Sequence, residues 1–360
     1  MSRVNTPLNW VVFCRVLDNH GDLGVSWRLA TQLAQRHQQV RLFVDDASAL
    51  EWMAPEGCEG VKVLPWPDAE TVLAEPSSAD VVIEAFGCEI PASFQAAMAA
   101  WRKPPVWINL EYFSAEHQAV RNHGLPSPVM SGPAKGMTKW FYFPGLHQDS
   151  GGVMRGWGAI TDSASADSVT TGPTGHHFHP QRLNISVFCY EPAGLGPWLQ
   201  QLNALPARVS LTVTAGRATQ AVRLALQTWP HPPRFLVREL PYLSQAAFDQ
   251  LLAEQDLNLV RGEDSLVRAI WAGKAFLWQI YPQQDGAHWS KLNAFLQASQ
   301  APPVVVQAHL AWNADQPTPV PDLTPAVMAQ WRAWAVGLRD SLAAKTDLVT
   351  KLESFVAAHG

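Results

Sequence analysis

The stretch Leu8-Asn-Trp-Val-Val-Phe-Cys-Arg-Val16, followed by Asp18-Asn-His-Gly-Asp-Leu-Gly24, decides the fold of the first part of the chain. The first segment is a near-continuous apolar run, which is typical of a strand buried on both faces of a parallel sheet. A polar turn follows, and from Val25 to Arg36 the apolar residues recur with helical spacing. This order of strand, turn and helix predicts the first unit of an α/β fold.

The same alternation continues outward from this unit and then restarts after a polar interruption. Further buried strands are expected at Val40–Val44, Val61–Leu64, Val81–Ala85 and Val106–Leu110, with a helix near Pro91–Trp101. Residues 161–180 are small, polar and rich in Gly and Pro, which indicates a linker or loop. Buried strands separated by helices indicate parallel βαβ units in a doubly wound sheet.

A second α/β half follows the interruption. Its strands are expected at Leu183–Tyr190, Val209–Thr214, Phe235–Leu240, Asp256–Val260 and Phe276–Ile280. Its helices are expected near Gly194–Leu205, Ala218–Trp229, Ser244–Glu254, Leu266–Ala272 and His288–Gln297, with a helical tail from Pro325 to about Ala358. We expect a domain over residues 1–165, a linker over 166–182 and a domain over 183–344 across a cleft, and the helix 345–360 could pack back on the first domain.

Composition narrows the class of protein. The 360 residues carry 26 Lys+Arg and 31 Asp+Glu, a formal net charge of −5, whereas a protein that coats nucleic acid shows a basic excess. Hydrophobic residues make up 47% and charged residues 16%, so the chain can bury a large core and does not resemble a disordered protein. A chain of this length exceeds one ordinary core, which favours two domains.

The cysteines and the hydropathy of the chain indicate the cellular compartment in which the protein is expected. The four cysteines, Cys14, Cys58, Cys88 and Cys189, have no CxxC spacing, which argues against a disulfide framework and a zinc ribbon. The apolar stretch Trp10–Cys14 is too short for a signal peptide, and no run approaches the roughly 20 apolar residues that span a bilayer. We therefore expect a soluble cytoplasmic protein with no membrane partner.

The first candidate site is the turn that contains Asp18 and Asp22. It lies where the first strand leads into the first helix, the edge at which open α/β sheets bind ligands. Its glycines do not follow the G-x-G-x-x-G spacing, and two acids would repel a pyrophosphate. The turn is better suited to hold a cation or a general base, and a helix-capping turn is an equally good interpretation.

The second candidate site is Leu259-Val-Arg-Gly-Glu-Asp-Ser265, where a buried strand ends and a helix begins. A helix start offers free N–H groups to a diphosphate, and Arg261 could add a charge-assisted contact. Glu263 and Asp264 would then face sugar or base rather than phosphate. The alternative is a capped helix with an Arg–Glu surface pair.

Aromatic residues and histidines supply further candidates. Phe188 and Tyr190 come at the end of the strand expected over Leu183–Tyr190, and alternation puts them on one face. There they could clamp a flat base, although core packing is the commoner explanation. His176-His177-x-His179 has ligand-like spacing but no partner acid or cysteine, so a metal site is not expected there. Neither G-x-S-x-G nor a P-loop motif occurs.

Two long segments carry a resemblance to a known family. Phe13-Cys-Arg-Val-Leu-Asp-Asn-His-Gly-Asp-Leu-Gly-Val-Ser-Trp-Arg-Leu-Ala30 and Val260-Arg-Gly-Glu-Asp-Ser-Leu-Val-Arg-Ala-Ile-Trp-Ala-Gly-Lys274 strongly resemble EarP, the protein-arginine rhamnosyltransferase family that acts on translation elongation factor P. Asn109–Glu116 and Phe188–Glu191 also resemble its segments. The chain departs from the family at His20, where an aromatic residue is usual, and in its Ser/Ala-rich linker.

The resemblance implies a GT-B glycosyltransferase that transfers rhamnose from dTDP-β-L-rhamnose to an arginine of elongation factor P, with inversion and without a metal or other cofactor. The N-terminal half would receive the acceptor and the C-terminal half the donor. By the same resemblance Asp22 would be the general base, Asp18 its orienting neighbour and Glu263 a second essential acid. The donor-binding residues it implies are Phe188, Tyr190 and Phe248 around thymine, Arg261, Asp264 and Ser265 around the diphosphate, and Gln245 nearby.

Two other functions remain open at the level of sequence. The chain could be a GT-B transferase that uses another nucleotide sugar or another acceptor. It could also be a non-catalytic module that binds a nucleotide sugar. Acidic residues at both candidate sites favour catalysis over bare binding.

Overall fold

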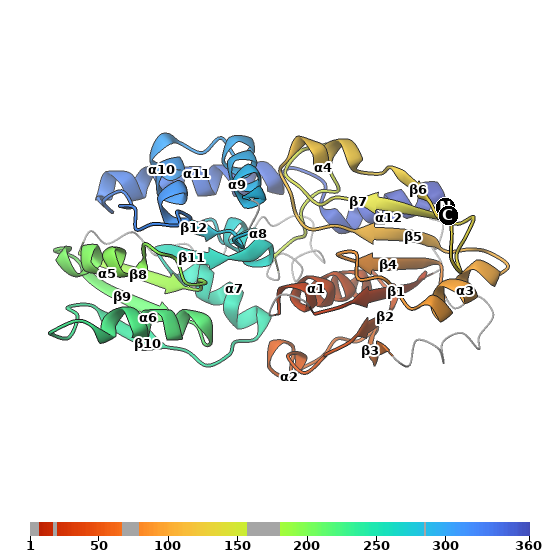
Figure 1. The fold of residues 1–360 in the computed structure, drawn as a ribbon, viewed down its shortest axis with the longest axis horizontal. Coiled ribbons are helices and arrows are strands. Elements are labelled where there is room, and N and C mark those ends of the chain that lie inside the picture. Colours follow the sequence, from red (N-terminus) through yellow and green to blue (C-terminus); the bar gives the residue numbers. More distant parts are fainter. Residues whose placement is uncertain (1–6, 17–19, 67–78, 157–180, 284–285) are drawn as a thin grey trace, which may run out of the picture. The chain divides into compact units, whose positions relative to one another are not determined.

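The computed structural model describes residues 7–16, 20–66, 79–156, 181–283 and 286–360 of the chain. The chain divides into two compact units (Figure 1). The first unit comprises Met1–Met154 together with Lys345–Gly360, and the second comprises Arg155–Ala344. The predicted linker 166–182 lies almost wholly outside the described residues, as does the histidine cluster at residues 176–179.

The first unit is built on a seven-stranded sheet with the order β3-β2-β1-β4-β5-β7-β6. Its strands are β1 (Asn9–Cys14), β2 (Gln39–Val44), β3 (Val61–Pro65), β4 (Val81–Ala85), β5 (Val106–Leu110), β6 (Pro126–Pro128) and β7 (Thr138–Tyr142). Neighbouring strands are parallel except for β6 and β7, which pair antiparallel. Its helices are α1 (Gly21–Gln35), α2 (Leu50–Met53), α3 (Ala92–Ala100), α4 (His117–Asn122) and α12 (Leu348–His359).

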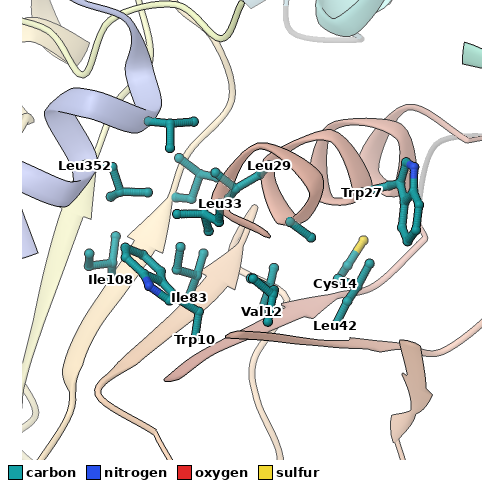
Figure 2. Packing of buried hydrophobic residues seen from close by; sticks show 14 of the residues in the cluster. Trp10, Val12, Cys14, Trp27, Leu29, Leu33, Leu42, Ile83, Ile108 and Leu352 are labelled. Carbon is teal, nitrogen blue, oxygen red and sulfur yellow. The ribbon is translucent and has the colours of Figure 1, made fainter. Parts of the chain in front are cut away.

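Alternation along β1 divides the core of the first unit between the two faces of its sheet. Trp10, Val12 and Cys14 belong to a cluster with residues of α1 and α12. Val11 and Phe13 belong to a second cluster, which includes residues of α3. Figure 2 shows the first cluster, in which side chains of α1 and Leu352 of α12 gather over the strands. Both faces of the sheet are therefore covered, as the apolar run of β1 predicts.

The second unit is built on a five-stranded parallel sheet with the order β10-β9-β8-β11-β12. Its strands are β8 (Arg182–Val187), β9 (Arg208–Val213), β10 (Leu236–Glu239), β11 (Leu257–Arg261) and β12 (Ala275–Gln279). Its helices are α5 (Leu195–Ala204), α6 (Arg217–Gln227), α7 (Gln245–Glu254), α8 (Gly262–Ala272), α9 (Ala287–Ala298), α10 (Pro303–Trp312) and α11 (Pro325–Ala343).

Among its parallel strands, each sheet reverses the strand order once, between β1 and β4 in the first unit and between β8 and β11 in the second. In open α/β sheets, ligands bind outside the carboxyl ends of the strands at such a reversal. The prediction of two parallel α/β units is confirmed. The carboxyl ends of these four strands are consequently the first places to look for a functional site.

Two predicted elements differ from the structure. The strand expected over Leu183–Tyr190 ends at Val187, because the N–H of Tyr190 bonds to the side chain of Gln279 rather than to a neighbouring strand. The helical tail from Pro325 is two helices, α11 and α12, because Asp347 caps a new helix by accepting a hydrogen bond from the N–H of Thr350. The first of these helices belongs to the second unit and the other to the first.

Candidate functional site

Asp22 lies in the first turn of α1, the helix that follows β1 in the chain. Only 3% of the residue is exposed. A carboxylate in the first turn of a helix is stabilised by the positive end of the helix dipole. The hydroxyl of Tyr112 donates a hydrogen bond of 3.0 Å to Oδ1 of Asp22. The predicted base is therefore a buried carboxylate held at the carboxyl edge of the sheet.

Tyr112 and Phe86 form an aromatic pair beside this carboxylate. Tyr112 follows β5 and Phe86 follows β4, so the two neighbouring strands bring them together. Their rings are stacked with centroids 4.3 Å apart and an interplanar angle of 14°. The sequence alone indicated no role for either residue, although both come shortly after the ends of the predicted strands β4 and β5, which pair with each other.

Cys14, the last residue of β1, carries a thiol on which the charge of Asp22 acts. Burial raises the pKa of this thiol to about 12. A hydrogen bond with Ser26 lowers the pKa, and the negative charges of Asp22 and Asp45 raise it further. A thiol with so high a pKa stays protonated near neutral pH and is a poor nucleophile or base.

The other residues of the predicted turn are only partly described. Asp18 lies outside the described residues. His20 packs edge-on against Trp52, with ring centroids 5.3 Å apart. The position at which the family usually has an aromatic residue is thus filled by a ring that makes an aromatic contact.

In the second unit, Arg261 joins two of the predicted aromatic residues. Arg261 ends β11, and its guanidinium carbon lies 4.5 Å from the ring centroid of Phe188 and 4.7 Å from that of Tyr190. Its Nη1 also donates to the carbonyl oxygen of Cys189, at 3.2 Å. Both rings therefore contact the guanidinium of Arg261, although they lie in the loop after β8 and not on a strand. Phe248 extends this group by an edge-on contact with Phe188, with centroids 5.3 Å apart.

A second arginine reaches the same tyrosine. The guanidinium carbon of Arg217, in the first turn of α6, lies 4.8 Å from the ring centroid of Tyr190. Arg217 also forms a two-point ion pair with Glu191, and its hydrogen bonds lower the pKa of that carboxyl group. Two guanidinium groups at the carboxyl ends of β8, β9 and β11 make this edge suitable for an anion.

The acids at the start of α8 have basic partners that the sequence did not reveal. Glu263 forms an ion pair with Lys291 of α9. Asp264 lies 3.5 Å from Nη1 of Arg268, one helical turn further along α8. Arg268 also donates to the backbone oxygen of Gln245, which brings this predicted residue into the same group. The surface pair between Arg261 and Glu263 that the sequence offered as an alternative is not the one found. Glu263 pairs with Lys291 instead, and Arg261 contacts aromatic rings.

The backbone at the start of α8 is shaped by Gly262 and Ser265. Gly262 has a φ of +65°, and a β-carbon there would lie 3.3 Å from the hydroxyl of Tyr190. The hydroxyl of Ser265 accepts a hydrogen bond of 3.0 Å from the N–H of Arg261 and donates one of 2.5 Å to its carbonyl oxygen. These contacts fix the loop that presents Arg261 to the rings. Within the described residues, no group of three or more His, Cys, Asp or Glu side chains could hold a metal ion.

The chain is similar to known proteins over most of its length. A family model described as Elongation-Factor P (EF-P) rhamnosyltransferase EarP matches residues 10–357. A protein-arginine rhamnosyltransferase of Pseudomonas putida is 40% identical over 347 residues, which cover 90% of this chain and 86% of that protein. A protein-arginine rhamnosyltransferase of Pseudomonas aeruginosa is 37% identical over 383 residues, which cover 97% and 99%.

Solved structures show the same likeness. One, which describes EarP-mediated arginine glycosylation of translation elongation factor EF-P, matches with a TM-score of 0.61 at 28% identity and covers 98% of this chain and 99% of its own. Arabidopsis thaliana UGT89C1 complexed with UDP-L-rhamnose matches with a TM-score of 0.56 at 11% identity, over 98% and 99% of the two chains. At that identity the second match concerns the fold alone.

Proposed function

The chain belongs to the EarP family of protein-arginine rhamnosyltransferases, and we propose that it transfers rhamnose from dTDP-β-L-rhamnose to one arginine of translation elongation factor P. Its two parallel α/β sheets form a GT-B glycosyltransferase fold. The observation that carries the proposal is the family match over residues 10–357, which spans both units. We propose that the reaction takes place in the cytoplasm.

On the acceptor side, Asp22 is the proposed general base. An arginine side chain is protonated at neutral pH and its lone pairs are delocalised, so it is a poor nucleophile without help. A buried carboxylate can orient one guanidinium nitrogen and accept its proton during attack. The burial of Asp22 and its place beyond the end of β1 support this role. Asp18 is the proposed orienting neighbour.

On the donor side, the proposed site lies around Arg261. Phe188, Tyr190 and Phe248 form the thymine pocket, and Arg261 and Ser265 serve the diphosphate together with the N–H groups at the start of α8. The contacts of Arg261 with two of these rings support a single site for base and phosphate. Asp264 and Gln245 support it through Arg268, to which both are bonded.

The proposed reaction is an inverting displacement. A guanidinium nitrogen forms a bond to the anomeric carbon of rhamnose while the bond from that carbon to the diphosphate oxygen breaks. The proton leaves the attacking nitrogen for the Asp22 carboxylate, and the electron pair of the broken bond leaves with dTDP. The attack occurs from the face opposite the leaving group, so a β-linked donor yields an α-linked product.

The leaving dTDP carries the negative charge that must be stabilised. We assign this stabilisation to Arg261 and the N–H groups at the start of α8, which act as fixed positive charge where a metal ion acts in other transferases. Glu263 is the proposed second acid, and its ion pair with Lys291 keeps its carboxylate in a defined place. Activity that survives a strong chelator of divalent metals is the expected result.

Replacement of Asp22 tests the proposed function at its chemical step. Asp22→Asn removes the proton acceptor and keeps the shape of the side chain, so we expect transfer to fall by about 10²–10⁴-fold. Binding of dTDP-β-L-rhamnose, measured by calorimetry, should stay unchanged because the proposed donor residues belong to the other unit. The matched control is Asp149→Asn, since the side chain of Asp149 is 67% exposed. Wild-type turnover in Asp22→Asn would contradict the assignment of the base.

A further inference from the structure

The carboxylate of Asp22 is held by a side chain that lies 90 residues further along the chain. The Tyr112 hydroxyl donates to Oδ1 at 3.0 Å, and a neutral donor to a charged acceptor makes a stronger bond than one between two neutral groups. Asp22 is 3% exposed whereas Tyr112 is 36% exposed. The tyrosine therefore lies between a buried carboxylate and the surface.

The ring of Tyr112 is supported by a residue in a strained conformation. Phe86 has a φ of +57°, a left-handed conformation that costs a residue with a side chain roughly 1–2 kcal/mol. The strain persists because the surrounding bonds determine the turn: the N–H of Phe86 bonds to the carbonyl oxygen of Leu110 at 2.7 Å, and the N–H of Gly87 bonds to Oδ1 of Asn109 at 3.1 Å. Strain of this kind is concentrated at functional sites.

These hydrogen bonds join the ends of β4 and β5, the strands that Phe86 and Tyr112 follow. The side-chain amide of Asn109 also donates to Oε1 of Glu111 at 2.7 Å, which fixes the residue before Tyr112. The stack at 4.3 Å then fixes the plane of the phenol ring. The hydroxyl is thus directed at the carboxylate by contacts between the segments that follow β4 and β5.

We propose that Tyr112 is a positioning residue that orients the Asp22 carboxylate for proton transfer, with Phe86 holding the tyrosine in place. The inference rests on the proposed role of Asp22 as the base. A base must present its oxygen within hydrogen-bond reach of the proton that it accepts, and a buried carboxylate with one fixed oxygen cannot rotate away. A hydrogen bond donated to a carboxylate also favours its charged form over its protonated form.

Other titratable groups surround this carboxylate and must be separated from the effect of Tyr112. The charges of Asp22 and of Asp45, which follows β2, both act on the thiol of Cys14 in β1. His20, at the start of α1, acts on Asp46. Removal of the Tyr112 hydroxyl deletes its hydrogen bond to Oδ1 of Asp22. A moved pH profile in a Tyr112 variant therefore reports the lost phenol donor.

The test is Tyr112→Phe, which keeps the stack on Phe86 and deletes only the hydroxyl. We expect kcat to fall about tenfold or more, the effect of losing one hydrogen bond to a charged group, with the KM for the donor within twofold of wild type. The acid limb of the kcat–pH profile should move to higher pH, because the carboxylate loses a donor that favoured its charged form. Tyr142→Phe is the matched control, since its hydroxyl contacts backbone oxygens of Gly151 and Leu348 in the same unit.

The outcomes separate this inference from the proposed function. Wild-type kcat and an unmoved acid limb in Tyr112→Phe, beside an inactive Asp22→Asn, would overturn the inference and leave the base in place. A lower kcat with an unmoved limb, as expected of a residue that only supports the fold, would overturn it as well. Full activity in Asp22→Asn would overturn the proposed base and this inference together.

Discussion

Arg261 shows how one residue can serve two parts of a ligand. Its guanidinium lies over the rings of Phe188 and Tyr190 and bonds to the backbone oxygen of Cys189. A guanidinium is planar and carries five donors, so it can keep an aromatic contact while it donates to an anion. A lysine in its place would carry the same charge without the plane or the fork of donors.

The substitution Arg261→Lys tests this view. We expect it to weaken dTDP binding about tenfold, because a compact ammonium neither stacks on the rings nor binds phosphate oxygens in a bidentate manner. Isothermal titration with dTDP measures the change. Arg238→Lys, on the exposed strand β10, is the matched control and should bind as wild type does. Equal affinity in the Arg261 and Arg238 variants would contradict a role for the guanidinium plane.

Sequence alone indicated Asp22 and Glu263 as candidate acids but gave no sign of the residues that contact them in the structure. Asp22 and Glu263 stand beside glycines at a strand-to-helix junction, a pattern that can be seen in one segment. Tyr112 reaches Asp22, and Lys291 reaches Glu263, from distant parts of the chain. Such pairs depend on strand order and helix packing, and a single sequence without an alignment gives no direct signal for them.

At the scale of elements, buried parallel strands were the most predictable feature. β4 and β5 have the predicted bounds, because each is a short apolar run with a clear polar end. The short helices α2 and α4, and the antiparallel pair of β6 and β7, were missed. An element of three to six residues contains too few positions to establish a helical or strand period.

The helix α10 was missed for another reason and carries a buried histidine. Its sequence Pro303-Val-Val-Val306 has the β-branched composition of a strand, but two prolines at its start favour a helix. His309 in this helix is fully buried, with Nδ1 2.9 Å from the carbonyl oxygen of Val305. Its Nε2 has no hydrogen-bond partner among the described residues.

Because of His309, we expect the stability of the second unit to fall in acid. Burial lowers the pKa of His309 from 6.5 to about 4. Between these two values the unfolded chain binds a proton that the folded chain does not, so the unfolding free energy falls as the pH drops from 6.5 towards 4, by up to about 3 kcal/mol. Above pH 6.5 both states are neutral at this position and the effect vanishes.

Urea unfolding at a series of pH values measures this effect. His309→Met fills a similar volume without a titratable group and should flatten the dependence between pH 6.5 and 4. The matched control is His231→Gln, at an exposed position, which should keep the wild-type dependence. An unchanged slope in His309→Met would show that other groups govern the acid sensitivity.

At the scale of the whole molecule, the chain returns to its first unit at its C-terminus. Leu348, Val349, Leu352 and Val356 of α12 join the core cluster of α1 and the first sheet. Arg36, just after α1, pairs with Asp347 at 3.0 Å and with Glu353 at 3.2 Å. The acceptor unit that we propose is therefore completed only when the last helix has been synthesised.

Two further features of the whole chain concern membrane-spanning helices and the state of the cysteines. In the part of the chain that the structure describes, no helix combines the length and the apolar character needed to cross a bilayer. All four cysteines are free. The proposed chemistry depends on neither observation, since it rests on the family and on the side chains at the two sheet edges.

The central claim is that this chain joins rhamnose to one arginine of elongation factor P. The most direct measurement is the intact mass of purified elongation factor P after incubation with this chain and dTDP-β-L-rhamnose, beside a variant of the acceptor whose modified arginine is lysine. We expect a gain of one deoxyhexose on the wild-type acceptor and no gain on the lysine variant. No gain on the wild-type acceptor, with the enzyme folded and the donor shown to bind, would contradict it.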